Sequence, residues 1–274
     1  MTYHKQVFEG DVSVNVKLRL FLILLTIGFL GVLSLLLIDM EGIITLLPIP
    51  AEEIPTITPA LKLLTLVQPT LILAVCVLVG VALASKVGLT SPVAEAAANR
   101  GDLVSALKPQ IIPGLIGGLI GGVAVVSIAA AFIPFLPPEL VPVISAFGRF
   151  LPLPTRLLYG GIVEELLLRW GFMTVLVWAA WRFFQKGKDR PRTSLLIGAI
   201  VISSVVFGIG HLPVAYMLYP NPTPALVSFV IIGNSTFGMI AGYLYWKKGL
   251  ESAMIAHVLA HVVMFTASYF GAYF

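Results

Sequence analysis

The sequence predicts an all-helical, polytopic membrane protein with about seven to eight spans. Of its 274 residues, 58% are hydrophobic and only 11% are charged. In a typical soluble domain, about a quarter of the residues are charged. The mean hydropathy is +1.01. The apolar residues gather into runs of about 20, and a helix of that length crosses the ~30 Å hydrocarbon core of a bilayer.

Charge and cysteine usage narrow the functional class further. The net charge is +4 and the pI is 9.2, values that in a soluble protein would fit a nucleic-acid binder. Here the basic residues lie in loops between apolar runs, where they determine membrane topology. We therefore expect the lipid bilayer, and no nucleic acid, as a partner. The single cysteine, Cys76, lies in an apolar run, which excludes a disulfide framework and a cysteine metal cluster.

The apolar runs predict the spans in chain order. They are expected at about 18–38, 61–84, 111–133, 156–184, 195–211, 225–246 and 250–273. A short interfacial helix is expected near 145–151, and its proline-rich surroundings could add an eighth span. Residues 1–150 are then an N-terminal three-span region, and 151–274 are a four-span catalytic core of the same membrane unit. Basic loops alternate with acidic or neutral ones, including the acidic loop 39–59, so the N-terminus is predicted to be cytoplasmic.

The third span carries a stripe of glycines. Its members are Gly114, Gly117, Gly118, Gly121 and Gly122. Small residues three and four positions apart let a second membrane helix approach closely. A cofactor-binding glycine loop is disfavoured, because no strand precedes these glycines.

The fourth span contains three ionisable residues within six positions, Glu164, Glu165 and Arg169. Each such residue at the centre of a membrane helix raises the insertion free energy by roughly 2.5–3.5 kcal/mol. Glu165 and Arg169 lie one helical turn apart and can form an ion pair. Glu164 points about 100° away from Glu165, which leaves its carboxylate available for chemistry. In the alternative interpretation, all three residues only fix helix packing through a polar seam.

Three histidines lie in or at the ends of the later spans, at His211, His257 and His261. A single histidine in an apolar helix is usually a hydrogen-bonded packing contact. However, His257 and His261 share one helix face, and Phe207 lies one turn before His211. Because buried polar groups need partners, we expect the histidines to meet Glu164 in one pocket.

Two chemistries can be built from these residues. In the first, Glu164 takes a proton from a water that His211 helps to hold, and His257 with His261 donates hydrogen bonds to the oxyanion of amide hydrolysis. In the second, His211, His257, His261 and Glu164 ligate zinc. The zinc-protease motif requires a glutamate directly after the first histidine. No glutamate lies between His257 and His261. We therefore expect no cofactor, with zinc as the alternative.

These motifs, in this order in successive spans, resemble the CAAX prenyl protease and bacteriocin-processing family of intramembrane proteases, which includes the Ras-converting CAAX endopeptidase. The resemblance covers about residues 151–270. It is carried by Glu164-Glu165-x-x-x-Arg169, Phe207-x-x-x-His211 and His257-x-x-x-His261.

The resemblance implies a helical membrane fold with a conical cavity, and it implies a role for each motif residue. By this resemblance Glu164 activates water, Glu165 and Arg169 support it, His211 completes the water site, and His257 stabilises the oxyanion. The prenyl-directed members usually have asparagine at the next position, where this chain has His261. This histidine keeps the hydrogen-bonding capacity and adds a potential zinc ligand.

The resemblance also implies the substrate class. Family members cut peptides near the membrane, and the prenyl-directed members remove the last three residues after a lipidated cysteine. We therefore expect a membrane-anchored peptide or protein substrate, with prenylated proteins among the candidates. A non-catalytic membrane scaffold or a bacteriocin self-immunity protein of the same fold is the alternative. A proton-relaying transporter is a third, weaker interpretation, since the chain shows no paired halves.

Overall fold

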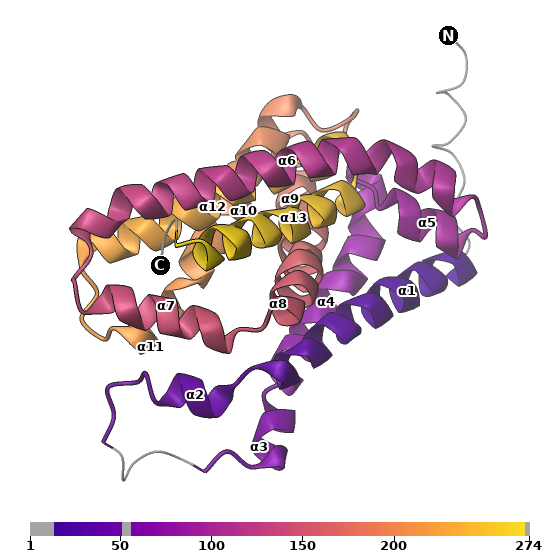
Figure 1. The fold of residues 1–274 in the computed structure, drawn as a ribbon. Helices are drawn as coiled ribbons and strands as arrows, with labels where there is room; N and C mark the ends of the chain where they lie inside the picture. The colour runs from indigo at the N-terminus through magenta and orange to yellow at the C-terminus, as the bar shows by residue number, and fades with distance from the viewer. Residues whose placement is uncertain (1–13, 51–55, 272–274) are drawn as a thin grey trace.

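The computed structural model describes residues 14–50 and 56–271, and these residues form helices and connecting loops without a β-strand. The N-terminal tail and residues 51–55 of the acidic loop lie outside the described residues, as do residues 272–274 at the end of the predicted seventh span. The long helices are α1 (Val14–Leu33), α4 (Val67–Leu83), α6 (Leu103–Phe132), α10 (Thr193–Gly210), α12 (Pro224–Lys247) and α13 (Leu250–Tyr269) (Figure 1). By length and composition, six helical segments built on these helices can cross a membrane. The predicted all-helical membrane fold is confirmed.

The fourth predicted span, 156–184, is a helix with unusual hydrogen bonding. It begins with α8 (Leu153–Thr155), continues through two π-helical segments, η5 (Arg156–Glu164) and η6 (Leu166–Met173), and ends with α9 (Thr174–Phe184). A π-helix has i→i+5 hydrogen bonds, which are rare and occur often at functional sites. This segment carries all three ionisable residues of the first motif.

The shorter helices lie at both ends of the long helices (Figure 1). They are α2 (Met40–Ile44), α3 (Pro59–Leu64), α5 (Pro92–Ala98), α7 (Leu140–Phe150) and α11 (Leu212–Leu218). The helix expected near 145–151 is present as α7, but it begins earlier, at Leu140. In Figure 1, α7 and α11 lie near each other, beside the ends of α6 and α12.

Helix α6 is longer than the predicted third span. It begins at Leu103 rather than near residue 111 and contains Pro109 and Pro113. The Asp102 side chain caps its first turn by accepting hydrogen bonds from the backbone N–H groups of Val104 and Ser105. Such a cap stabilises a helix start by about 1 kcal/mol, which a hydropathy profile does not register.

The glycine stripe of α6 packs against two helices at once, as the small-residue pattern predicts. A Cβ at Gly118 would lie 2.6 Å from the carbonyl oxygen of Ala256 on α13. A Cβ at Gly121 would lie 2.8 Å from the Phe237 ring on α12. Helix α6 is therefore held between α12 and α13, and its glycines let it approach both (Figure 1).

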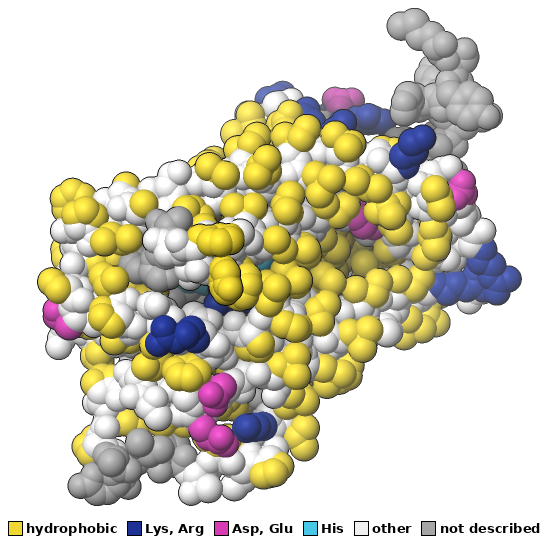
Figure 2. Space-filling model, in the orientation of Figure 1, with side chains coloured by type: hydrophobic (Ala, Val, Ile, Leu, Met, Phe, Trp, Pro, Cys, Tyr) yellow, Lys and Arg dark blue, Asp and Glu magenta, His cyan; other side chains and the backbone are white. Residues whose placement is uncertain are grey.

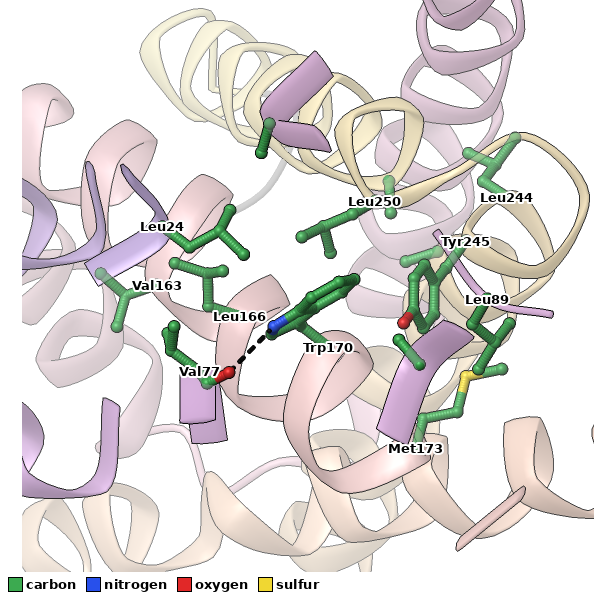
Figure 3. Close-up of a cluster of buried hydrophobic side chains, with 14 of the residues drawn as sticks. Leu24, Val77, Leu89, Val163, Leu166, Trp170, Met173, Leu244, Tyr245 and Leu250 are labelled. Atoms are coloured by element: carbon green, nitrogen blue, oxygen red, sulfur yellow. Dashed lines mark hydrogen bonds between the residues drawn. The ribbon is translucent and has the colours of Figure 1, made fainter. Parts of the chain in front are cut away.

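The core fixes the π-helical segment against α4. The side chain of Trp170 is fully buried, and its indole Nε1 donates a hydrogen bond to the Val77 carbonyl over 3.3 Å (Figure 3). Gly80 leaves room for the indole, because a Cβ there would lie 2.2 Å from the ring. On the far side, the hydroxyls of Thr174 and Tyr245 are hydrogen-bonded at 2.9 Å. The span that carries the glutamates is therefore anchored to both α4 and α12.

Candidate active site

A cavity of about 630 Å³ opens between the π-helical segment, α10, α12 and α13, and α7 and α11 contribute to its wall. All four side chains proposed for catalysis line this cavity: Glu164, His211, His257 and His261. Phe207 lines it too. In the space-filling view, histidine atoms are visible in the depth of a hollow framed by hydrophobic side chains (Figure 2).

Glu164 is the carboxylate that faces the cavity. Its Oε2 lies 3.8 Å from Nε2 of His257. This separation exceeds that of a direct hydrogen bond, but it places the two groups around one common space. Segments 93 residues apart in the sequence are thereby brought together, and the carboxylate points toward the histidines rather than toward lipid.

Glu165 lies behind the cavity and is fully buried. Its Oε1 lies 3.2 Å from Nη1 of Arg169 and accepts a hydrogen bond of 2.7 Å from Nδ1 of His257. Arg169 in turn donates through Nη2 to the Gly238 carbonyl over 3.0 Å. The ion pair expected from the sequence spacing is present, and it also reaches the third motif.

The contact between Glu165 and His257 determines the tautomer of the imidazole. An ionised carboxylate only accepts hydrogen bonds, so Nδ1 of His257 must carry the proton. The other ring nitrogen, Nε2, then faces Glu164 across the 3.8 Å gap. A carboxylate on one side of an imidazole also stabilises the imidazolium form, as in hydrolase triads.

Phe207 packs between the polar groups. Its ring meets His211 edge-on at a centroid distance of 4.8 Å and lies 5.9 Å from His257, also edge-on. The Arg169 guanidinium lies 5.1 Å from the centroid of the same ring. His211 is held by its backbone as well, because Nδ1 donates to the Phe207 carbonyl over 2.8 Å. Its Nε2 is therefore left as a hydrogen-bond acceptor in the neutral ring.

His261 stacks on His257, with ring centroids 4.8 Å apart and an interplanar angle of 10°. Its Nε2 is buried and has no hydrogen-bond partner among the described residues. Gly160 makes room for the ring, because a Cβ there would lie 2.3 Å from this nitrogen. The sequence showed that the two histidines share a face, but not that their rings are parallel.

Zinc ligation is the alternative use of these side chains. No three histidine, cysteine, aspartate or glutamate side chains within residues 14–50 and 56–271 are arranged to hold a metal ion. Nδ1 of His211 and Nδ1 of His257 are hydrogen-bonded to protein acceptors, which leaves Nε2 of each ring as the nitrogen that could bind a metal. Metal dependence stays a prediction to be tested, and the mechanism below uses no metal.

Sequence reasoning missed several residues of the cavity wall. Phe237 packs against His257 with ring centroids 4.3 Å apart, and Tyr159, Arg156 and Asn234 also line the cavity. Arg156 and Asn234 carry a visible signal, because they are polar residues in or beside an apolar run. The two aromatic residues carry none, since phenylalanine and tyrosine are frequent in membrane helices.

Comparison with known proteins relates residues 145–263 to one family of membrane peptidases. A family model described as type II CAAX prenyl endopeptidase, Rce1-like, matches residues 145–263. The match contains all three motifs and every helix that contributes a histidine to the cavity. Neither a curated protein nor a solved structure matches the chain. Residues 145–263 are therefore similar to the Rce1-like family of type II CAAX prenyl endopeptidases.

Proposed function

We propose that this protein is an intramembrane endopeptidase of the CAAX prenyl protease type. It hydrolyses a peptide bond of a membrane-anchored substrate with a water activated by Glu164. The observation that carries the proposal is the approach of Glu164 to His257 across 3.8 Å, in a cavity that also receives His211 and His261. Ionisable side chains are energetically unfavourable at membrane depth, and their gathering in one cavity is expected when they serve one reaction.

Glu164 acts as the general base. A carboxylate shielded from bulk water is a stronger base near neutral pH than an exposed one. It takes a proton from a water that His211 holds through Nε2, its remaining acceptor. The water oxygen forms a bond to the carbonyl carbon of the scissile amide. Glu164 then returns the proton to the leaving nitrogen as the C–N bond breaks, so that two shorter peptides are the products.

The histidine pair stabilises the tetrahedral oxyanion. With Nδ1–H bonded to Glu165, His257 can donate through Nε2 only when it carries a second proton. The Glu165 carboxylate favours this imidazolium from the opposite side of the ring. His261, parallel to it, has an unsatisfied Nε2 that can supply the second hydrogen bond.

The cavity wall supports a lipid-anchored substrate. Apolar side chains of α7, α11 and α12 form much of it, including Ile144, Leu218 and Phe229. Such a wall suits an acyl or prenyl chain, and prenylated proteins are the leading candidates. The apolar surface of the six membrane-spanning segments keeps the site beside the bilayer that holds such anchors. The basic loops support an orientation with the N-terminus in the cytoplasm.

A paired substitution tests the proposal. The Glu164→Gln protein should lose cleavage of a lipid-anchored peptide by at least about 100-fold, since a positioned base contributes about 10²–10⁴ in rate. The matched control is Glu41→Gln, an exposed carboxylate near Lys62, which should cleave at the wild-type rate. Retained cleavage by a folded Glu164→Gln protein would reject the assignment and favour the non-catalytic alternative.

Metal dependence is tested separately. We expect purified protein to keep its activity after treatment with a strong chelator. Stoichiometric zinc that is lost together with activity, and restores it on addition, would show that the ligands rearrange around a metal.

A further inference from the structure

A second cavity lies beside the reaction cavity, and one side chain lines both. It has a volume of about 270 Å³ and opens between residues 65–72, at the start of α4, and the π-helical segment. Its lining residues are Thr65, Gln68, Pro69, Ile72, Tyr159 and Leu167. Tyr159 also lines the reaction cavity that contains Glu164. The Tyr159 side chain is therefore a wall that the two cavities share, and the hydrolytic mechanism does not use it.

The second cavity is lined by polar groups that lack protein partners. Within residues 14–50 and 56–271, neither the Gln68 amide nor the Tyr159 hydroxyl has a hydrogen-bond partner. Pro69 has no N–H, so it cannot give the Thr65 carbonyl the usual helical hydrogen bond. Polar groups in apolar surroundings are energetically unfavourable unless water binds them. A water molecule takes about 30 Å³ in the liquid, so the second cavity has room for several.

A lipid-anchored substrate creates a need for a separate source of water. Each peptide bond that is cleaved consumes one water molecule, yet the wall of the reaction cavity is largely apolar, with Ile144, Leu218 and Phe229 among its residues. An acyl or prenyl chain bound to this wall excludes water from that side of the site. Water that enters through a second, polar cavity still reaches the Glu164 carboxylate when the substrate is bound.

The π-helical bonding of η5 brings Tyr159 to the same side as Glu164. The two residues are five positions apart in η5. In an α-helix, five positions correspond to about 140° of rotation beyond one full turn, so the two side chains would point in different directions. With i→i+5 hydrogen bonds, the second residue lies about one turn after the first. Both side chains accordingly line the reaction cavity.

We propose that the second cavity holds water and delivers it past the Tyr159 hydroxyl to Glu164. The inference rests on the proposed peptidase function. A phenol both donates and accepts hydrogen bonds, so the hydroxyl can hold a water between the second cavity and the carboxylate. Tyr159 is in this view a positioning residue, and Glu164 remains the group that takes the proton.

The first experiment identifies what fills the second cavity by cysteine labelling. Ile72→Cys and Leu71→Cys are each made in a Cys76→Ala background, which removes the single native cysteine. The two positions differ in depth by about 1.5 Å along α4. Ile72 lines the second cavity, whereas Leu71 lines neither cavity although it is more exposed, at 63% against 44%. A small, positively charged methanethiosulfonate should modify Ile72→Cys at least about tenfold faster, because the reactive thiolate forms where water solvates it.

The second experiment measures whether this water reaches the reaction. Tyr159→Phe removes only the hydroxyl, so kcat for a lipid-anchored peptide should fall about 3- to 10-fold with KM unchanged, as expected for the loss of one hydrogen bond. Gln68→Leu, which removes the amide from the second cavity, should lower kcat in the same way. Thr236→Val is the matched control, because it also removes one hydroxyl from a membrane helix but lines neither cavity. It should keep the wild-type kcat.

The outcomes that overturn the inference are distinct from failure of the peptidase function. Equal labelling of Ile72→Cys and Leu71→Cys means that the second cavity holds no water. An unchanged kcat in Tyr159→Phe means that water does not pass the hydroxyl, and a raised KM without a lower kcat means that the second cavity receives the substrate. Each of these results overturns the inference and leaves the function intact. If the wild type cleaves no peptide, or if Glu164→Gln cleaves as fast as the wild type, the function itself fails and the delivery of water to Glu164 falls with it.

Discussion

Removing the charge of Glu165 should destabilise this protein more than most single substitutions do. Glu165 is fully buried with its Oε1 3.2 Å from Nη1 of Arg169. With an effective dielectric constant of about 20, Coulomb's law gives an attraction of ~5 kcal/mol at this distance. Substitutions that leave one member of a buried pair behind destabilise by about 3–5 kcal/mol. We expect Glu165→Gln to fall within this range, since it keeps the side-chain shape and leaves Arg169 without its counter-charge.

A double-mutant cycle separates the ion pair from general packing. Arg169→Met should be similarly destabilising, because it leaves Glu165 buried and unpaired. The double variant Glu165→Gln/Arg169→Met should lose at least about 2 kcal/mol less than the sum of the two single losses, because no charge then remains buried alone. The measurement is denaturant or thermal unfolding of detergent-purified protein. Each single variant should lower Tm by on the order of 10 °C.

An additive double variant would refute this reasoning. Additivity would mean that Glu165 and Arg169 act independently, although the structure places them in contact. Glu165→Gln should also weaken peptidase activity, because its carboxylate orients His257 through a 2.7 Å hydrogen bond. Arg169→Met leaves that hydrogen bond in place, so at equal stability it should impair catalysis less.

Three further predictions follow from other parts of the structure. Gly80→Ala places a Cβ 2.2 Å from the buried ring of Trp170, so it should destabilise by about 1–3 kcal/mol, measured as a lower denaturation midpoint. Gly160→Ala places a Cβ 2.3 Å from Nε2 of His261, and a displacement of this size should reduce kcat/KM at least about tenfold in the peptide assay. Burial raises the pKa of Glu95 above its ordinary value of 4.5, so the stability from its protonated form is present below pH 4.5 and is lost as the pH rises through the raised pKa. Thermal scans should therefore show Glu95→Gln to be more stable than the wild type at pH 8 and similar to it at pH 4.

Glycine controls at positions with free space for a Cβ accompany these measurements. Gly198 and Gly233 have no neighbouring atom within 4 Å of an added Cβ. Alanine at either position should be neutral or should stabilise by up to about 1 kcal/mol. If alanine at Gly198 or Gly233 destabilises the protein as much as Gly80→Ala does, a steric clash with Trp170 does not explain the loss of stability in Gly80→Ala. For Glu95, a stability difference that does not change with pH would contradict the assigned cause.

Much of the fold could be predicted from the sequence, because the length of each apolar run shows directly whether a helix can cross the membrane. Long apolar runs identified the spans, and the glycines at 114–122 identified a helix that approaches two neighbours closely. The start of α6 could not be found this way, because a side-chain cap at Asp102 and prolines inside a helix both leave the hydropathy unchanged. The π-helical segment was missed for a related reason, since hydropathy does not distinguish i→i+4 from i→i+5 hydrogen bonding.

The candidate site was predictable as a set of residues but not as an arrangement. Ionisable residues at membrane depth are so unfavourable that Glu164 and the three histidines had to be partners of one another. Which nitrogen of His257 carries the proton depends on a contact with Glu165, a residue 92 positions away in the chain. The central place of Phe207 among these groups likewise required the three-dimensional packing of α10 against α13 and η6.

The position of α6 limits how far the chain can be truncated without disturbing the site. The family match begins at residue 145, whereas α6 ends at Phe132. A fragment restricted to the matched range would keep every motif yet expose the face of α13 against which Gly114, Gly118 and Gly122 pack. The helix that carries His257 would then be free to tilt. The smallest active fragment must therefore extend upstream to residue 103, beyond the boundary that the motifs alone suggest.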